Sequence, residues 1–288
     1  MRIFNLKVDS GEKLAIEKND KLYLLEDLGY RLKDMNELID REIDLSNIDF
    51  SKAKALDRTY NIQSPIVYPK QDIICLGMNY SDHKDEVEKV SKEDFSKDVD
   101  TIYFSKRANR ILGYGDTIPL NENITNQLDY EVELCLIIGK DAKNVSKKEA
   151  SSYIFGFSIF NDLSARDLQR KYKQRYYGKS FDYSSVMGPA ILINDGSFNY
   201  NNLELATRIN GDLRQKNTTK NMILSVDGII EDLSKAMTLK KGTIIATGTP
   251  AGVAMSSDSF GYLSKGDEIQ MEIENIGELY NKIDWFII

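Results

Sequence analysis

The 288-residue chain carries a formal net charge of -7 and has a pI near 5.0, which argues against binding to the phosphate backbone of nucleic acids, because that affinity comes from clustered lysine and arginine. Its start lacks the apolar core of a secretory signal, and no apolar run is long enough to cross a bilayer. We therefore expect a soluble, cytoplasmic protein without membrane contact, long enough for one large domain and a small appended unit.

The first 60 or so residues predict a small β-rich unit. Short runs that alternate apolar and polar residues occur in the first 25 positions, and such alternation is typical of half-buried strands. The segment 64–70 then contributes two of the five prolines and is followed at once by the strand-like run 73–77. We place the domain boundary there, with the small unit at 1–65 and the main domain at 66–288.

The main domain is expected to contain more strands than helices. Apolar runs predict strands at 131–139, 153–160, 187–193, 203–210, 243–247 and 268–273. Helices are predicted at 81–90, 146–153, 164–177 and 222–233, each opened near a serine, aspartate or asparagine that can cap free N–H groups. Cys75 and Cys135 lie in apolar runs and are expected to be reduced core thiols. The pattern predicts an α+β fold rich in β-strands.

Two glutamates stand in the predicted strand 131–139. A side-chain period of two puts Glu131 and Glu133 on one face. Burying two like charges so close together is costly unless they share a proton or hold a cation, and a divalent ion suits oxygen ligands. An acidic face open to water explains the pair equally well. Asp162, at the end of the next predicted strand, is either a third ligand or a helix N-cap.

The only histidine is His83, and Glu86 follows it at i+3 on the predicted helix. A carboxylate bonded to one ring nitrogen fixes the tautomer and makes the imidazole a better general base. Taken alone, the pair is more often solvated surface. The very polar segment 84–100 after it is either a solvated helix and loop or a mobile lid beside a site.

Two further segments offer groups for an anionic substrate. Lys179, beside a flexible glycine, supplies a positive charge, although an ordinary surface lysine is the alternative. The glycine- and threonine-rich turn 247–253, which includes Thr249, offers backbone N–H groups and hydroxyls that could bind a carboxylate. This turn matches neither standard phosphate-binding loop.

Together, and in this order, these segments resemble the fumarylacetoacetate hydrolase family from about residue 73 to the C-terminus. The matching segments are 77–80 with His83 and Glu86, 128–139, 161–169, 178–182, 210–215, 247–253 and 272–277. Residues 1 to about 60 are only loosely similar to the variable N-terminal unit of the family. The resemblance implies a mixed β-sandwich roll of the family's C-terminal type, usually as a homodimer.

The resemblance also implies a role for individual residues. Mg²⁺ or Mn²⁺ would be held by Glu131, Glu133 and Asp162. His83 with Glu86 would activate water, Lys179 would stabilise negative charge, and Arg166, Gln169 and Thr249 would contact substrate or order its neighbours. Tyr183 stands in a stretch that departs from many relatives and is expected to reshape the substrate pocket.

The expected reaction is hydrolysis of a C–C bond in an acylpyruvate-like 2,4-dioxo acid. In this hypothesis the metal binds the 2-oxo acid end, His83 deprotonates water, and the cation and Lys179 stabilise the leaving enolate. A 2-oxo-acid decarboxylase of the oxaloacetate type and a 2-hydroxymuconate-type isomerase need the same metal and enolate without the attacking water. A noncatalytic protein that binds a small ligand on the same fold is the remaining alternative.

Overall fold

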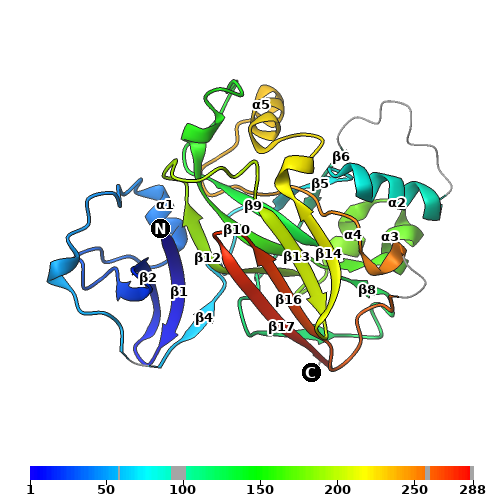
Figure 1. The fold of residues 1–288 in the computed structure, drawn as a ribbon, viewed down its shortest axis with the longest axis horizontal. Coiled ribbons are helices and arrows are strands. Elements are labelled where there is room, and N and C mark those ends of the chain that lie inside the picture. Colours follow the sequence, from blue (N-terminus) through cyan, green and yellow to red (C-terminus); the bar gives the residue numbers. More distant parts are fainter. Residues whose placement is uncertain (58, 92–101, 257–259, 286–288) are drawn as a thin grey trace.

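Most of the chain is placed in the computed structural model, which describes residues 1–57, 59–91, 102–256 and 260–285 (Figure 1). Two large β-sheets make up its centre, and the helices are short and few by comparison. The expected β-rich α+β fold is confirmed.

The larger sheet has ten strands, and their order places the N-terminal strands beside those of the main domain. The order is β3-β2-β1-β12-β10-β9-β15-β5-β6, with β4 paired to β1. Cys75 and Cys135 are free and buried in this sheet, as expected. Its strands are β1 (Arg2–Val8), β2 (Gly11–Lys18), β3 (Lys21–Leu24), β4 (Asn61–Gln63), β5 (Ile73–Gly77), β6 (Ile102–Lys106), β9 (Val132–Ile138), β10 (Ile154–Asp162), β12 (Ser185–Ile193) and β15 (Ile244–Ala246).

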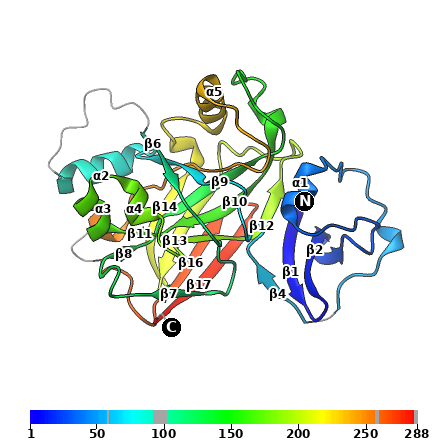
Figure 2. The ribbon, with the colours of Figure 1, turned by 180° about the vertical axis from the view of Figure 1, so that it is seen from behind.

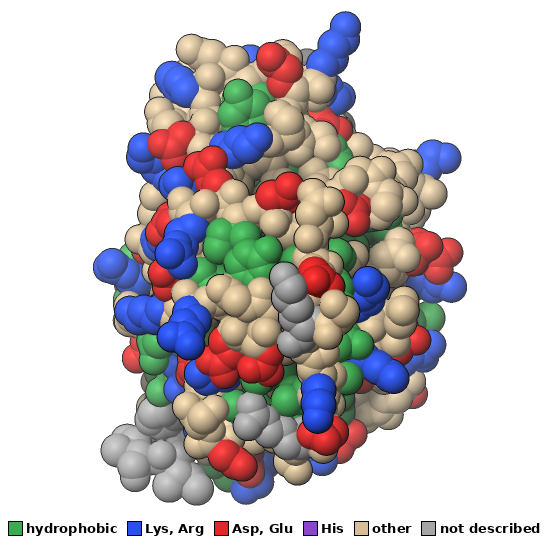
Figure 3. All heavy atoms as spheres, turned by 90° about the vertical axis from the view of Figure 1, so that its left-hand side faces the viewer, with side chains coloured by type: hydrophobic (Ala, Val, Ile, Leu, Met, Phe, Trp, Pro, Cys, Tyr) green, Lys and Arg blue, Asp and Glu red, His purple; other side chains and the backbone are tan. Residues whose placement is uncertain are grey.

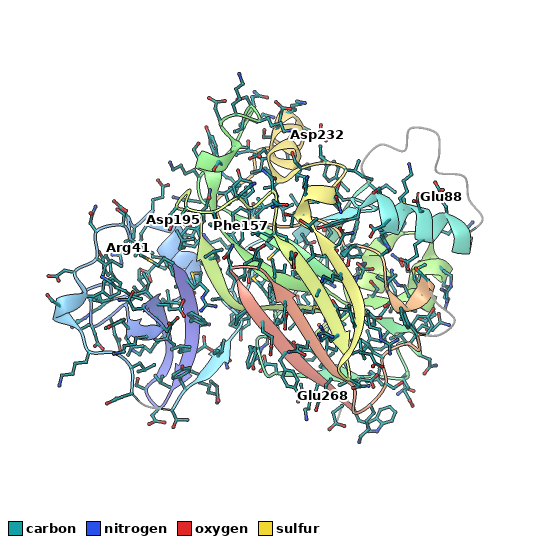
Figure 4. All side chains as sticks on the ribbon, in the orientation of Figure 1. Arg41, Glu88, Phe157, Asp195, Asp232 and Glu268 are labelled. Atoms are coloured by element: carbon teal, nitrogen blue, oxygen red, sulfur yellow. The ribbon has the colours of Figure 1, made fainter. Side chains whose placement is uncertain are left out.

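The second sheet has five strands and packs against the first. Its order is β14-β13-β16-β17-β7, formed by β7 (Thr117–Leu120), β13 (Glu204–Ile209), β14 (Asp212–Thr218), β16 (Glu268–Ile273) and β17 (Gly277–Trp285). One buried core joins both sheets, with Leu134 from β9, Phe157 from β10 and Met271 from β16 (Figure 4). The Phe157 ring stacks on Tyr200 with 4.8 Å between centroids. The two layers thus form a sandwich with an apolar interior.

The N-terminal strands extend the larger sheet on the left of Figure 1. Strand β1 pairs with β12 in antiparallel register, so that Ile3 lies opposite Ile191. Phe4, Leu6 and Leu24 form a small core that Ala190 of β12 joins. The N-terminal unit therefore shares both hydrogen bonds and apolar contacts with the main domain. Its boundary at residue 65 stays a prediction.

Two of the four helix predictions match the structure and two are wrong. Helix α2 (Ser81–Ser91) lies where expected. Helix α5 (Val226–Ala236) overlaps most of the predicted 222–233 but begins four residues later, because the Ser225 hydroxyl caps it by accepting the Gly228 N–H. The segment 146–153 forms only a 3₁₀ turn at Ala150–Tyr153. The segment 164–177 is divided, because Lys173 at φ 55° ends α3 (Arg166–Tyr172) before α4 (Arg175–Lys179) begins.

The helices α2, α3 and α4 gather at one end of the molecule, beside the two-stranded sheet β8 (Leu128–Asp129) and β11 (Ser164–Ala165) (Figure 2). Strand β10 runs toward this end and finishes at Asp162. On another side of the molecule, where the N-terminal unit faces the viewer, basic and acidic side chains are interspersed (Figure 3). Within the described ranges, no helix has the length and apolar composition that spanning a bilayer requires.

A glycine allows β10 and β12 to lie close together. A Cβ atom added at Gly156 would lie 2.4 Å from the Leu192 carbonyl oxygen and 2.5 Å from Ile191 Cγ2. Because backbone cannot yield as a flexible side chain does, Gly156→Ala is expected to lower the free energy of unfolding by about 2 kcal/mol. Urea denaturation measures the change. Gly261→Ala is the control, since a Cβ there meets nothing within 4 Å, and equal destabilisation of both variants would contradict the prediction.

Candidate active site

Three acidic side chains converge where β8, β9 and β10 meet. Glu131 lies in the link between β8 and β9, Glu133 lies on β9 and Asp162 ends β10. The main-chain N–H of Asp162 donates to the Glu131 carbonyl at 3.0 Å, which holds these two residues side by side. One ligand oxygen from each of the three carboxylates lies within 4.8 Å of the other two, and all three side chains are buried. We call this group the carboxylate triad.

Two members of the carboxylate triad bind cationic side chains. Lys179 Nζ lies 2.5 Å from Glu131 Oε2 and 2.6 Å from Asp162 Oδ2. Lys106 Nζ lies 2.5 Å from Asp162 Oδ1, and Arg166 Nη2 lies 2.6 Å from Glu131 Oε1. Burial alone would raise the pKa of Glu131, but the charges of Lys179 and Arg166 hold that pKa well below its usual range. Glu131 is therefore stable as an anion.

Glu133 differs from its two neighbours. Within the described residues its carboxylate accepts one hydrogen bond, from the Gly248 N–H at 2.8 Å, and forms no ion pair. Burial raises the pKa of Glu133 well above its usual value, and the nearby charges of Asp162 and Glu131 add to the rise. A buried carboxylate placed against two others is costly unless it takes up a proton or a cation lies among them. This set of three oxygen donors fits Mg²⁺ or Mn²⁺.

The predicted histidine–glutamate pair is formed on α2. His83 Nδ1 lies 3.2 Å from Glu86 Oε2. Both oxygens of Glu86 accept the Gly252 N–H at 3.1 Å, and this fixes the carboxylate. His83 is buried, with 7% of its surface exposed, and lines the same cavity as Glu131 and Glu133 of the carboxylate triad. A proton on Nδ1 that is donated to Glu86 leaves the Nε2 lone pair available as a base.

A cavity of about 440 Å³ collects most of the predicted site residues. It brings the catalytic and metal-binding candidates His83, Glu131, Glu133 and Lys179 together with Arg166, Gln169 and Thr249. Gln169 Oε1 accepts from Arg166 Nη1 at 3.1 Å, and Thr249 Oγ1 accepts from the Gln215 amide at 2.8 Å. Two candidates for substrate contact are thus oriented by hydrogen bonds.

Tyr183 lies elsewhere. It has φ 64° and lines a separate cavity of about 170 Å³, together with Phe181 and Leu128. The structure therefore does not bring Tyr183 into the cavity of the carboxylate triad. Of the predicted lid 84–100, residues 84–91 continue α2, whereas 92–100 lie outside the described residues.

Three residues of this region were not predicted from the sequence. Lys106 is fully buried and binds Asp162, and Asp129 accepts from Arg166 Nε at 2.8 Å. Arg175 lines the cavity from the start of α4. For Lys106, the only signal in the sequence is that a lysine ends the apolar run 102–106. The pairing of β6 with β5 brings this run to the site.

Several known proteins are similar to this chain in sequence and in fold. Residues 72–284 match the fumarylacetoacetate (FAA) hydrolase C-terminal family. Oxaloacetate tautomerase YisK of Bacillus subtilis (strain 168) is 41% identical over 222 residues, which are 77% of this chain and 72% of that protein. A fumarylacetoacetate hydrolase structure from Exiguobacterium antarcticum superposes with a TM-score of 0.88 at 33% identity, over 99% of this chain and 100% of that chain.

A further solved relative is a 5-carboxymethyl-2-hydroxymuconate delta-isomerase from Mycobacterium smegmatis, with a TM-score of 0.76 and 25% identity over 100% of both chains. Proteins named as a hydrolase, a tautomerase and an isomerase thus share this sequence pattern and fold. The resemblance seen in the sequence is confirmed. The chain belongs to the fumarylacetoacetate hydrolase family of enzymes.

Proposed function

We propose that this enzyme moves a proton between the keto and enol forms of a small 2-oxo dicarboxylic acid of the oxaloacetate type. The observation that carries the proposal is that one cavity is lined by a base, two members of the carboxylate triad and several cationic side chains. Keto–enol interconversion needs a base for the carbon-bound proton and stabilisation of the enolate. The tautomerase name of the Bacillus subtilis relative supports the same chemistry.

Glu131, Glu133 and Asp162 would hold Mg²⁺ or Mn²⁺. When bound, the ion would polarise the 2-oxo group and stabilise the charge that develops as the enolate forms. Lys179 already bridges Glu131 and Asp162, so its ammonium group fixes the two carboxylates and adds a positive charge beside the reacting oxygen.

In the proposed step, His83 Nε2 takes the proton from the carbon next to the 2-oxo group. The Gly252 N–H fixes the carboxylate of Glu86. Glu86 in turn orients the imidazole ring of His83 and stabilises the ring while it carries the proton. The protonated imidazole of His83 then releases its proton, and the 2-oxo oxygen takes up one proton from it or from solvent water, which completes the enol and leaves His83 neutral. The reverse sequence returns the enol to the keto acid.

Hydrolysis of an acylpyruvate-like 2,4-dioxo acid is the second candidate. The same His83–Glu86 pair would then deprotonate water, and the Exiguobacterium antarcticum structure, which covers 99% of this chain, carries the hydrolase name. This candidate requires room for a water molecule between His83 and the carbonyl under attack.

A homodimer and a cytoplasmic location remain part of the proposal. Light scattering measures the oligomeric state, and cell fractionation measures the location.

A substrate panel separates the candidates. Oxaloacetate enol decay is followed by ultraviolet absorbance, pyruvate release from oxaloacetate reports decarboxylation, and pyruvate release from acetylpyruvate reports hydrolysis. We expect enol–keto interconversion to be the fastest reaction, to require Mg²⁺ or Mn²⁺, and to stop in EDTA. Cleavage of acetylpyruvate without effect on the enol would favour the hydrolase. If the acids raise the melting temperature but are never converted, the protein is a noncatalytic binder.

A further inference from the structure

The cavity of the carboxylate triad has a strongly basic wall. Five cationic side chains from α3, α4 and the turn between them line it: Arg166, Arg170, Lys173, Arg175 and Lys179. Arg166 and Lys179 bind carboxylates of the site, and Arg170 donates to the Gln127 side chain. Among the described residues, Lys173 and Arg175 have neither a carboxylate partner nor a hydrogen bond from the side chain. Two of the five cations of this wall, Lys173 and Arg175, therefore have no directly paired anion among the described residues.

Arg175 is the part-buried member of this unbalanced pair. Its guanidinium lies against Gly77 at the end of β5, where an added Cβ would meet Arg175 Nε at 3.2 Å and Cζ at 3.3 Å. The guanidinium carbon lies 5.7 Å from the centre of the Phe104 ring, and Lys179 Nζ lies 5.5 Å from the same ring. The Phe104 ring thus lies beside both Arg175 and Lys179, the lysine that binds Glu131 and Asp162 of the carboxylate triad.

This environment favours an anion from outside the protein. Burial lowers the pKa of the Arg175 guanidinium, whereas the charge of Glu131 opposes that change. Arginine remains protonated in proteins, so the cost of its partial burial persists. A carboxylate that enters the cavity would offset this cost with two parallel hydrogen bonds to the guanidinium.

We propose that Arg175, with Lys173 beside it on the rim, binds the second carboxylate of the substrate and makes the enzyme selective for 2-oxo dicarboxylic acids over 2-oxo monocarboxylic acids of equal length. The proposal rests on the proposed function, since it assumes that the 2-oxo acid end lies at the carboxylate triad. The second carboxylate then reaches the wall formed by α3 and α4. Arg175 sets which acid binds and takes no part in the proton transfer.

Binding is the first test, because it needs no turnover. Calorimetric titration with Mn²⁺ present compares 2-oxoglutarate with 2-oxovalerate, which share a carbon chain and differ in the terminal carboxylate. We expect the wild-type enzyme to bind the dicarboxylic acid about ten- to hundredfold more tightly, the range of a charge-assisted hydrogen-bonded pair. Arg175→Gln is expected to remove this preference, and Arg175→Lys to retain part of it.

Lys171→Gln is the matched control, since Lys171 is an exposed cation on α3 that does not line the cavity. It is expected to leave the preference unchanged. Equal affinity of the wild-type enzyme for the two acids, or a preference that survives in Arg175→Gln, overturns the proposal. Binding of neither acid overturns it as well.

Kinetics distinguish this inference from the proposed function. With oxaloacetate, Arg175→Gln is expected to raise KM about ten- to hundredfold and to change kcat much less. If no acid in the panel is converted but the preference still depends on Arg175, the proposed function fails and the assignment of Arg175 stands. If oxaloacetate is turned over rapidly and KM is unchanged in Arg175→Gln, the assignment of Arg175 fails and the proposed function stands.

Discussion

Glu133→Gln is expected to weaken the binding of Mg²⁺ or Mn²⁺ on the order of a hundredfold or more and to remove most of the activity. Glu133 supplies one of the three carboxylates that lie within 4.8 Å of one another. Residues that only hydrogen-bond to a metal ligand contribute about ten- to hundredfold to metal affinity. The loss of a charged ligand itself is therefore expected to have a larger effect. Glutamine has nearly the same shape and still accepts the Gly248 N–H.

Titration with MnCl₂ measures the metal affinity directly, and activity against free Mn²⁺ measures its consequence. In the absence of metal, Glu133→Gln is expected to melt no lower than the wild-type enzyme, because it removes repulsion among three buried carboxylates. Glu272→Gln is the control, since Glu272 is exposed on β16 of the other sheet. Unchanged Mn²⁺ affinity in Glu133→Gln, or full activity of the wild-type enzyme in EDTA, would refute the metal site.

His83→Ala is expected to lower kcat by about 10²- to 10⁴-fold, the usual contribution of a general base. His83 is the only histidine of the chain, so no second imidazole can replace it. Glu86→Gln should cause a smaller loss, because it weakens the orientation of the ring at the 3.2 Å contact but leaves the base in place. The binding of Mn²⁺ should remain near the wild-type value in both variants.

Steady-state kinetics on the substrates that the panel identifies measures these losses, and added imidazole should restore part of the activity of His83→Ala. Asp85→Asn is the control, since Asp85 lies exposed on the same helix. If His83→Ala keeps more than about a tenth of the wild-type kcat, the pair on α2 does not supply the general base.

The carboxylate triad was within reach of sequence reasoning because two of its members, Glu131 and Glu133, are only two residues apart in the chain. The period of two predicted that Glu131 and Glu133 share one strand face. In the structure their carboxylates do lie together, although Glu131 precedes β9, and Val132 and Leu134 are buried in the core between the sheets. The spacing of His83 and Glu86 was equally local, since one turn of α2 decides it. Hydrolysis as the reaction stays a prediction, because the residues of this site serve several reactions of one enolate.

Lys179 and Arg166 were predicted from the sequence, but two further cations of the site, Lys106 and Arg175, were not, because tertiary contacts bring them there. Lys106 reaches Asp162 only through the pairing of β5 with β6, and Arg175 faces the cavity only because α3 ends at Lys173. A continuous helix over 164–177 was expected there. The position of Tyr183 in a separate cavity likewise depends on how the chain turns after α4.

The antiparallel pairing of β1 with β12 also covers the backbone groups at one end of an apolar strand. Strand β12 is nine residues long and largely apolar, and Arg2 and Ile3 of β1 pair with Leu192 and Ile191 at its end. Removal of the first 65 residues would leave this end of β12 with unpaired N–H and C=O groups beside apolar side chains. Such an exposed border recruits further chains by strand addition. We therefore expect the chain without residues 1–65 to aggregate more readily than the full chain.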